Sequence, residues 1–178
     1  MNVSVLRLGY RVSRDDRITT HAALVSRAFG CNRIYMTLVD DSILDSVESI
    51  CERWGRNNDF KLEIIQDWKS LCKSWKKHKG LIVHLTMYGI NIGKVNLNLD
   101  GNKDVLVIIG ASKVPKEVYS YADYNIAIGN QPHSEISALA IFLDRLFEGK
   151  QLDCTFKDAK MIIRPSLYGK EVQRITDP

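Results

Sequence analysis

The sequence contains few of the residues that mark several common classes of protein. Its four cysteines (Cys31, Cys51, Cys72 and Cys154) lie far apart and include no C-x-x-C pair. This spacing indicates neither a zinc site nor a disulfide framework, and it is typical of a protein kept in a reducing compartment. No apolar run approaches the length of a membrane span, and the start MNVSVLRLGYR lacks the apolar core of a signal peptide. We therefore expect a cytoplasmic protein that binds neither a metal nor a membrane.

The motifs of several common active sites are also absent. The sequence has no G-x-G-x-x-G dinucleotide fingerprint, no G-x-x-x-x-G-K-[ST] phosphate loop and no G-x-S-x-G nucleophile elbow. Ser134 follows His133 directly, but adjacent side chains rarely face each other, so the pair does not indicate a hydrolase. Any small-molecule site in this chain must therefore be built in another way.

What is present is a globular composition, with 45% hydrophobic and 26% charged residues in 178. Such a chain can bury a sizeable core and fits one domain over residues 1–178, with a short C-terminal extension from about residue 150 where the pattern becomes less regular. The net charge of +4 permits a polyanionic partner.

Short apolar runs alternate with helical patterns, which predicts an α/β fold with a mostly parallel sheet. We expect strands at 3–8, 33–38, 60–65, 81–85, 105–109, 125–128 and 161–163. We expect helices at 20–29, 42–56, 67–78, 115–121 and after the polar elbow that ends near residue 135. The segment 90–99 is ambiguous, because its asparagines disfavour the helix that the alternation calls for.

The last helix is apolar on nearly all sides. One stripe consists of Ile136, Leu139, Ala140, Leu143, Leu146 and Phe147, and a second consists of Ala138, Ile141 and Phe142. Such a helix must be covered on two sides, one of them by its own sheet. A second subunit could cover the other side, so the pattern favours a homodimer.

Polar loops follow three of the predicted strands, at 86–89, 110–114 and 129–135. The carboxyl ends of parallel strands meet at one edge of a sheet, where open α/β folds bind small ligands. Gly110 and Gly129 would let the backbone approach such a ligand closely. The alternative is that these are ordinary connections, because glycines end strands in many proteins.

Basic residues concentrate in two places. Arg7, Arg11, Arg14, Arg17 and Arg27 all precede residue 28, and we interpret them as contacts to a nucleic-acid backbone. A second cluster occupies the predicted helix at 67–78 and consists of Lys69, Lys73, Lys76, Lys77 and, just beyond it, Lys79. For these lysines we favour a solvated helix face.

Three segments carry a family resemblance: RLGYRVSRDDRITTHAALVSRAFG, DVLVIIGASKVP and ADYNIAIGNQPHSEISALAIFLDRL. Together they resemble the archaeal tRNA cytidine-56 2′-O-methyltransferases, a family of the SPOUT superfamily of knotted methyltransferases. The resemblance covers essentially the whole chain. It implies helices on both faces of the sheet, a C-terminal deep trefoil knot (the SPOUT fold), a homodimer, S-adenosylmethionine as methyl donor, and methylation of the ribose of cytidine 56 in the T-loop of tRNA.

The resemblance also implies which residues bind the donor. They are Leu85, Gly110, Ala111, Ser112, Lys113, Val114, Ile128, Gly129, Asn130, Gln131, Pro132, His133, Ser134 and Glu135. Ser134 matches a serine of the superfamily's third motif, whereas Ser112 stands where the family usually has glutamate. These positions belong to the loops already selected from the strand pattern.

The acceptor side is less determined by the resemblance. The superfamily's first motif has an asparagine followed six residues later by an arginine, and His21 and Arg27 have this spacing with histidine in place of asparagine. Alignment on Phe29-Gly30 instead puts Leu24 at the arginine position, and Arg17 is a rival. Our hypothesis is that Arg27 lies near the ribose 2′-hydroxyl and stabilises the developing alkoxide, while the loop 11–17 clamps the tRNA backbone.

Two other functions remain open at the level of the sequence. One is a knotted methyltransferase acting on another RNA position, and the other is a non-catalytic RNA-binding dimer. Donor binding separates the silent dimer from both enzymes, and mapping of the modified nucleotide separates the two enzymes.

Overall fold

A computed structural model describes residues 1–9, 16–97 and 103–175 of the chain. Its main sheet has six parallel strands in the order β3-β2-β1-β5-β4-β6. The strands are β1 (Val3–Leu8), β2 (Arg33–Met36), β3 (Lys61–Ile64), β4 (Leu81–Asn91), β5 (Val105–Gly110) and β6 (Tyr124–Ala127). The apolar run 105–109 is completely buried at the sheet centre, as expected for a strand covered on both faces.

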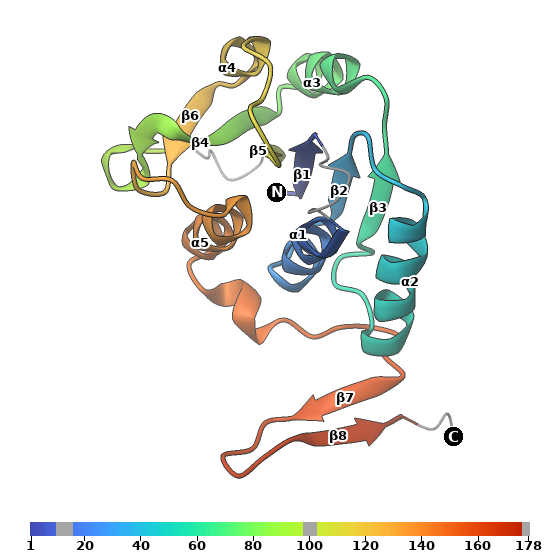
Figure 1. Cartoon of the computed structure of the whole chain (residues 1–178). Coiled ribbons are helices and arrows are strands. Elements are labelled where there is room, and N and C mark those ends of the chain that lie inside the picture. Colours follow the sequence, from blue (N-terminus) through green and yellow to red (C-terminus); the bar gives the residue numbers. More distant parts are fainter. Residues whose placement is uncertain (10–15, 98–102, 176–178) are drawn as a thin grey trace.

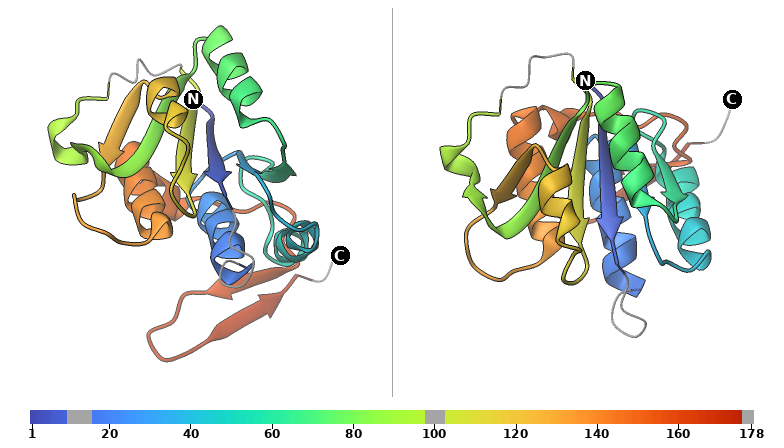
Figure 2. Two further views of the ribbon diagram at one scale, coloured as in Figure 1. Left: turned by 45° about the horizontal axis from the view of Figure 1, so that its top comes forward. Right: turned by 90° about the horizontal axis from the view of Figure 1, so that it is seen from above.

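Helices cover both faces of this sheet (Figures 1 and 2). On one face lie α1 (Asp16–Ala28), α2 (Ser42–Trp54) and α5 (Glu135–Phe147), and on the other lie α3 (Trp68–Lys77) and α4 (Glu117–Tyr121). The larger core packs Leu139 and Phe142 of α5 with Val5 and Val107 of the sheet. The expected mostly parallel α/β fold with helices on both faces is therefore confirmed.

The strand order brings three loops together. The chain runs outward from β1 to β3, returns to β4, inserts β5 between β1 and β4, and then adds β6 outside β4. The polar segment 86–89, which lies in an irregular part of β4, and the loops after β5 and β6 are therefore neighbours at one edge of the sheet.

The segment 90–99 is not built as a helix over its described part. β4 continues to Asn91, where Ile90 and Asn91 pair with β6 after a break in register at Leu85. A single 3₁₀ turn, η1 (Ile92–Lys94), follows and is capped by the Asn91 side chain, which accepts from the Gly93 N–H at 3.0 Å. Asparagine favours such local side-chain bonds over a regular helix. The end of the segment lies outside the described residues.

A hairpin follows the α/β layers. After a short turn, η2 (Lys150–Asp153), strands β7 (Met161–Arg164) and β8 (Glu171–Arg174) pair antiparallel, apart from the main sheet (Figure 1). Its stem is anchored at the end of α2, where Lys157 forms a bridge with Arg56 and the Lys160 N–H donates to the Arg53 carbonyl at 3.1 Å. The sequence pattern predicted β7 but missed β8.

No helix among residues 1–9, 16–97 and 103–175 is long and apolar enough to cross a membrane. Within the same ranges, no group of His, Cys, Asp and Glu side chains is arranged to hold a metal ion.

Candidate ligand-binding site

A pocket of about 680 Å³ opens where the irregular part of β4 after Leu85 meets the loops that follow β5 and β6. Its volume falls within the range of roughly 300–1,000 Å³ that is typical of small-molecule sites. Every predicted donor-site residue except Asn130 lines it: Leu85, Gly110, Ala111, Ser112, Lys113, Val114, Ile128, Gly129, Gln131, Pro132, His133, Ser134 and Glu135. Also along its walls are Ile18, His84, Thr86, Met87, Tyr88, Lys116, Tyr119 and Ala138.

Asn130 holds two of the pocket loops together rather than lining the pocket. Its side-chain amide donates to the carbonyls of Met87 at 2.8 Å and Gly89 at 3.0 Å. Gly89 lies against the backbone of β6, where an added Cβ would come within 2.5 Å of the Asn125 carbonyl oxygen. Residues 86–89 of β4, here called the β4 loop, therefore pack closely on β6 and are hydrogen-bonded to the elbow that follows β6.

The elbow between β6 and α5 is shaped by short-range contacts. Gly129 has a φ of +72°, a conformation that costs glycine little and side-chain-bearing residues more. The Ser134 hydroxyl accepts from the Ile136 N–H at 3.1 Å and caps α5. His133 Nε2 lies 2.6 Å from the Ile128 carbonyl oxygen and closes the turn. These contacts hold the elbow backbone against the pocket.

Arg7 contacts Glu135, the last residue of the elbow, from the end of β1. It is completely buried at the carboxyl end of β1, and its guanidinium lies 3.4 Å from the Glu135 carboxylate and donates to the Gly9 carbonyl at 3.2 Å. A buried charge is unfavourable unless it is paired and hydrogen-bonded. The pair joins residues 128 positions apart, and Glu135 itself lines the pocket. Arg7 thereby ties the start of α5 to β1.

His84 and Tyr119 form a polar wall that the sequence interpretation missed. The side-chain NH₂ of Asn125 donates to the Tyr119 carbonyl at 3.1 Å. The side-chain oxygen of Asn125 therefore faces His84 Nδ1, at 2.8 Å, and accepts from it. His84 Nδ1 then carries the proton and Nε2 is an acceptor, and burial lowers the pKa of His84, which keeps it neutral. The Tyr119 hydroxyl lies 3.1 Å from that of Thr86. The sequence offered one signal for this wall, a histidine within an apolar strand, because a buried polar group requires a hydrogen-bond partner.

The three predicted acceptor-side residues all lie on α1 but in different surroundings. Arg17 and His21 are exposed in the first half of the helix, and Ile18, next to Arg17, lines the pocket. Arg27 lies about 14 Å further along the helix axis than Ile18. Arg11 and Arg14 of the predicted basic loop lie outside the described residues.

The Arg27 side chain is hydrogen-bonded to the backbone at the end of α2. Only 8% of the residue is exposed, and its guanidinium donates to the carbonyls of Trp54 at 2.8 Å and Gly55 at 2.9 Å. It also lies over the Phe156 ring, 4.5 Å from the centroid. Burial lowers the pKa of Arg27, while the carbonyls at a helix C-terminus favour a cation. These contacts give Arg27 a structural role within the fold, away from the pocket.

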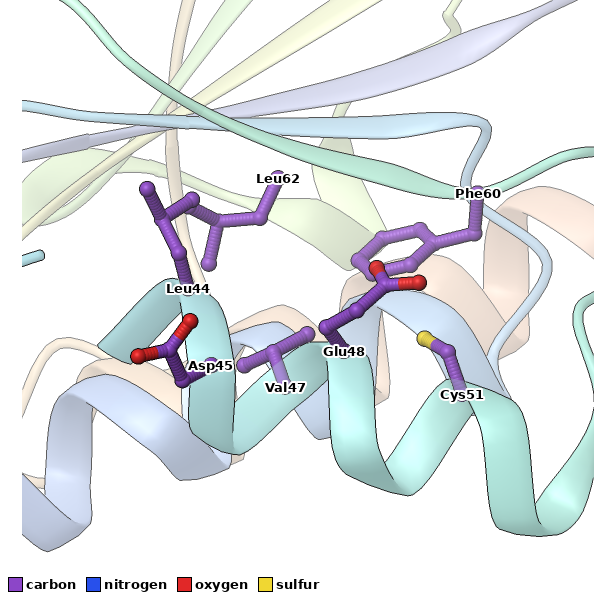
Figure 3. Close-up of a pocket in the computed structure, with 7 residues that line it drawn as sticks. All are labelled: Leu44, Asp45, Val47, Glu48, Cys51, Phe60 and Leu62. Carbon is purple, nitrogen blue, oxygen red and sulfur yellow. The ribbon is translucent and has the colours of Figure 1, made fainter. Parts of the chain in front are cut away.

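A second, smaller pocket of about 170 Å³ lies between α2 and β3 (Figure 3). The apolar side chains of Leu44, Val47, Phe60 and Leu62 line it together with Asp45, Glu48 and Cys51. Burial raises the pKa of the Cys51 thiol, so the protonated, unreactive form dominates. Burial likewise raises the pKa of Cys72 to about 11. Neither buried thiol provides a second reactive centre.

Comparison with known proteins identifies close relatives over nearly the full length. A family model described as tRNA ribose 2′-O-methyltransferase, aTrm56, matches residues 54–173. The tRNA (cytidine(56)-2′-O)-methyltransferase of Methanocaldococcus jannaschii is 52% identical over 98% of this chain and 97% of its own length. The enzyme of the same name from Thermococcus kodakarensis is 48% identical over 97% of both chains.

Solved structures show the same arrangement of strands and helices at low sequence identity. The SpoU methyltransferase AviRb from Streptomyces viridochromogenes, in complex with AdoMet, superposes with a TM-score of 0.63 at 11% identity, covering 84% of this chain and 58% of that one. The A. aeolicus TrmH/SpoU tRNA-modifying enzyme gives 0.60 at 15% identity, covering 88% and 80%. At these identities the likeness concerns the fold alone.

Proposed function

Because the chain belongs to the tRNA ribose 2′-O-methyltransferase family, we infer that it methylates the ribose 2′-oxygen of cytidine 56 in tRNA, with S-adenosylmethionine as methyl donor. The observation that carries this conclusion is 52% identity, over almost the whole of both chains, to an enzyme named for that reaction. The geometry agrees, since the pocket at the carboxyl edge of the sheet has the size and polarity of a small-molecule site.

The pocket fits the chemical groups of the donor. It combines loop backbone around Gly110 and Gly129, apolar side chains such as Leu85 and Ile128, and the carboxylate of Glu135. We propose that the two glycine loops enclose the adenosine and methionine parts, while Glu135, paired with Arg7, holds the start of α5 against the pocket. When bound, the donor supplies an electrophilic methyl group for transfer to an oxygen nucleophile. The residues of this chain must then orient the ribose hydroxyl and assist the loss of its proton.

For the acceptor we propose Arg17 as the residue that acts on the ribose hydroxyl. It is exposed at the start of α1, adjacent in sequence to a pocket residue, and its guanidinium is available to a phosphate or a developing alkoxide. His21 follows one turn later on a similar side of the helix. Arginine is a poor base, so its contribution is electrostatic stabilisation and positioning, which together can supply several kcal/mol of the barrier.

We also propose the finer features that the family resemblance implies. These are a deep trefoil knot formed by the C-terminal part of the α/β layers, a homodimer, a cytoplasmic location, and one domain over the whole chain with an extension from about residue 150. The dimer has support from α5, where Leu139 and Phe142 are buried while Ile141 is 44% exposed. Light scattering after size exclusion measures the mass, and a monomer at micromolar concentration contradicts the dimer.

The experiment that tests the function uses unmodified tRNA transcript and methyl-labelled S-adenosylmethionine. We expect one methyl group per tRNA, mapped to the ribose of cytidine 56. A methyl group at another nucleotide contradicts the target. Binding of tRNA without binding of the donor by calorimetry indicates a non-catalytic RNA-binding protein instead.

Asn130→Ala is expected to weaken donor binding about tenfold, because the variant loses both hydrogen bonds that hold the β4 loop to the elbow. Each such bond contributes on the order of 1 kcal/mol. Calorimetric titration with S-adenosylmethionine measures the change. Asn96→Ala, at an exposed asparagine beyond β4, is the matched control and should bind the donor normally. Equal affinities in the two variants would show that the tether does not shape the pocket.

A further inference from the structure

The hairpin segment 157–175 is basic and carries a net charge of +3. It contains five lysine and arginine residues against two carboxylates, whereas the whole chain has a net charge of +4. The basic residues are Lys157, Lys160, Arg164, Lys170 and Arg174. Such a segment attracts a polyanion and is repelled by a second copy of the same positively charged chain.

The hairpin also exposes apolar and aromatic side chains. Leu167 and Tyr168 in its turn are 94% and 97% exposed, and Ile163 in β7 is 63% exposed. An isolated two-stranded hairpin is only marginally stable in water, and large exposed apolar groups mark interaction surfaces. Aromatic groups interleaved with cations are the combination that binds unpaired nucleotides.

A groove of about 480 Å³ lies between the hairpin and the last residue of α2. Half-buried Trp54 contributes an aromatic side chain to it, Arg164 and Lys170 contribute two cations, and Glu171 contributes one carboxylate. The Arg164 guanidinium is held by the Gln173 side chain, to which Nε and Nη2 donate at 3.0 and 2.6 Å. Only one edge of the guanidinium is used in these bonds, so the remaining donors can reach a phosphate.

We propose that this groove is a second tRNA-binding site, in which an unpaired base stacks near Trp54 while Arg164 and Lys170 contact the neighbouring phosphates. The proposal rests on the proposed function for the identity of the substrate. α2 starts at the carboxyl edge of the sheet and ends at the amino edge, roughly 20 Å away for a helix of this length. The groove is therefore separate from the donor pocket and contacts a part of the tRNA distant from the methylated ribose.

The test compares two double variants with the same change in net charge. Arg164→Glu/Lys170→Glu alters the groove, and Lys73→Glu/Lys77→Glu alters exposed lysines of α3 on the opposite side of the sheet. We expect the groove variant to bind unmodified tRNA about tenfold more weakly than wild type. The slope of log Kd against log salt should fall by about one for each phosphate that the variant no longer neutralises. The α3 variant should change both quantities less.

Two further measurements separate the groove from its alternatives. In the groove variant, the affinity for S-adenosylmethionine and the oligomeric mass should stay as in wild type. In a separate variant, Trp54→Phe, the quenching of tryptophan fluorescence that tRNA causes should be partly lost. The proposal is overturned if both charge variants lose the same tRNA affinity, or if Trp54→Phe leaves the quenching unchanged. It is also overturned if the groove variant has a changed oligomeric mass, which would indicate a contact between subunits instead. If wild type methylates cytidine 56 while the groove variant binds tRNA normally, only the groove fails. If wild type methylates no tRNA, the proposed function itself fails.

Discussion

Arg17→Ala is expected to lower kcat for tRNA methylation by about 100- to 1,000-fold, the usual effect of removing a group that stabilises developing negative charge. Arg17 is exposed at the start of α1, beside pocket residue Ile18, so its loss leaves the core packing intact. The melting temperature and the affinity for S-adenosylmethionine should therefore remain close to those of wild type. Single-turnover methylation with saturating tRNA measures the chemical step apart from binding.

Arg17→Lys and His21→Ala are the informative companions to that variant. Lysine keeps the charge but loses the planar guanidinium, so we expect partial recovery of the rate. His21→Ala tests whether the histidine one turn later shares the role, and we expect a smaller loss than for Arg17→Ala. Full activity of Arg17→Ala would remove it from the acceptor side.

Arg27→Ala is expected to lower the free energy of unfolding by about 3 kcal/mol, because it leaves the carbonyls that end α2 without their charged donor. In a chain of this size such a loss corresponds to a melting temperature lower by roughly 6–12 °C. The variant also loses the packing on the Phe156 ring that fastens the segment leading to the hairpin. Thermal and urea unfolding measure the change.

Activity measured well below the melting temperature completes the Arg27 experiment. We expect the folded fraction of Arg27→Ala to methylate tRNA at nearly the wild-type rate, and Arg27→Lys to be destabilised less than Arg27→Ala. If Arg27→Ala is as stable as wild type, binds the donor and yet fails to methylate, Arg27 belongs to the acceptor side after all.

The comparison of Arg17 with Arg27 shows where inference from the sequence stops. Both arginines lie on α1, but the predicted helix 20–29 included only Arg27, and the spacing of His21 and Arg27 favoured the latter. The decisive contacts of Arg27 come from Trp54, Gly55 and Phe156, which no helical periodicity in its own segment can reveal. The early start of α1 at Asp16 was missed because its first turn contains a single apolar residue, Ile18, which is too few to define a helical periodicity.

The pocket that we propose for the donor was more predictable than the proposed acceptor side. Its loops follow apolar strands, and parallel strands necessarily present their carboxyl ends at one edge, so local pattern and sheet geometry were sufficient to select residues 110–114 and 129–135. The role of Asn130 as a tether was not predictable, because it depends on carbonyls of a bulged part of β4 more than 40 positions earlier.

The sequence by itself determined the alternation of strands and helices, the polar loops that build the pocket and, through its resemblance, the family. These properties reside in local periodicity, in apolar runs and in short motifs, all of which are readable without coordinates. The tertiary structure alone decided which arginine is buried, that Arg7 supports Glu135 from a distant strand, and that a basic hairpin stands beside Trp54. Burial and pairing of charge depend on chain segments far apart in sequence, and only the folded packing brings those segments into contact.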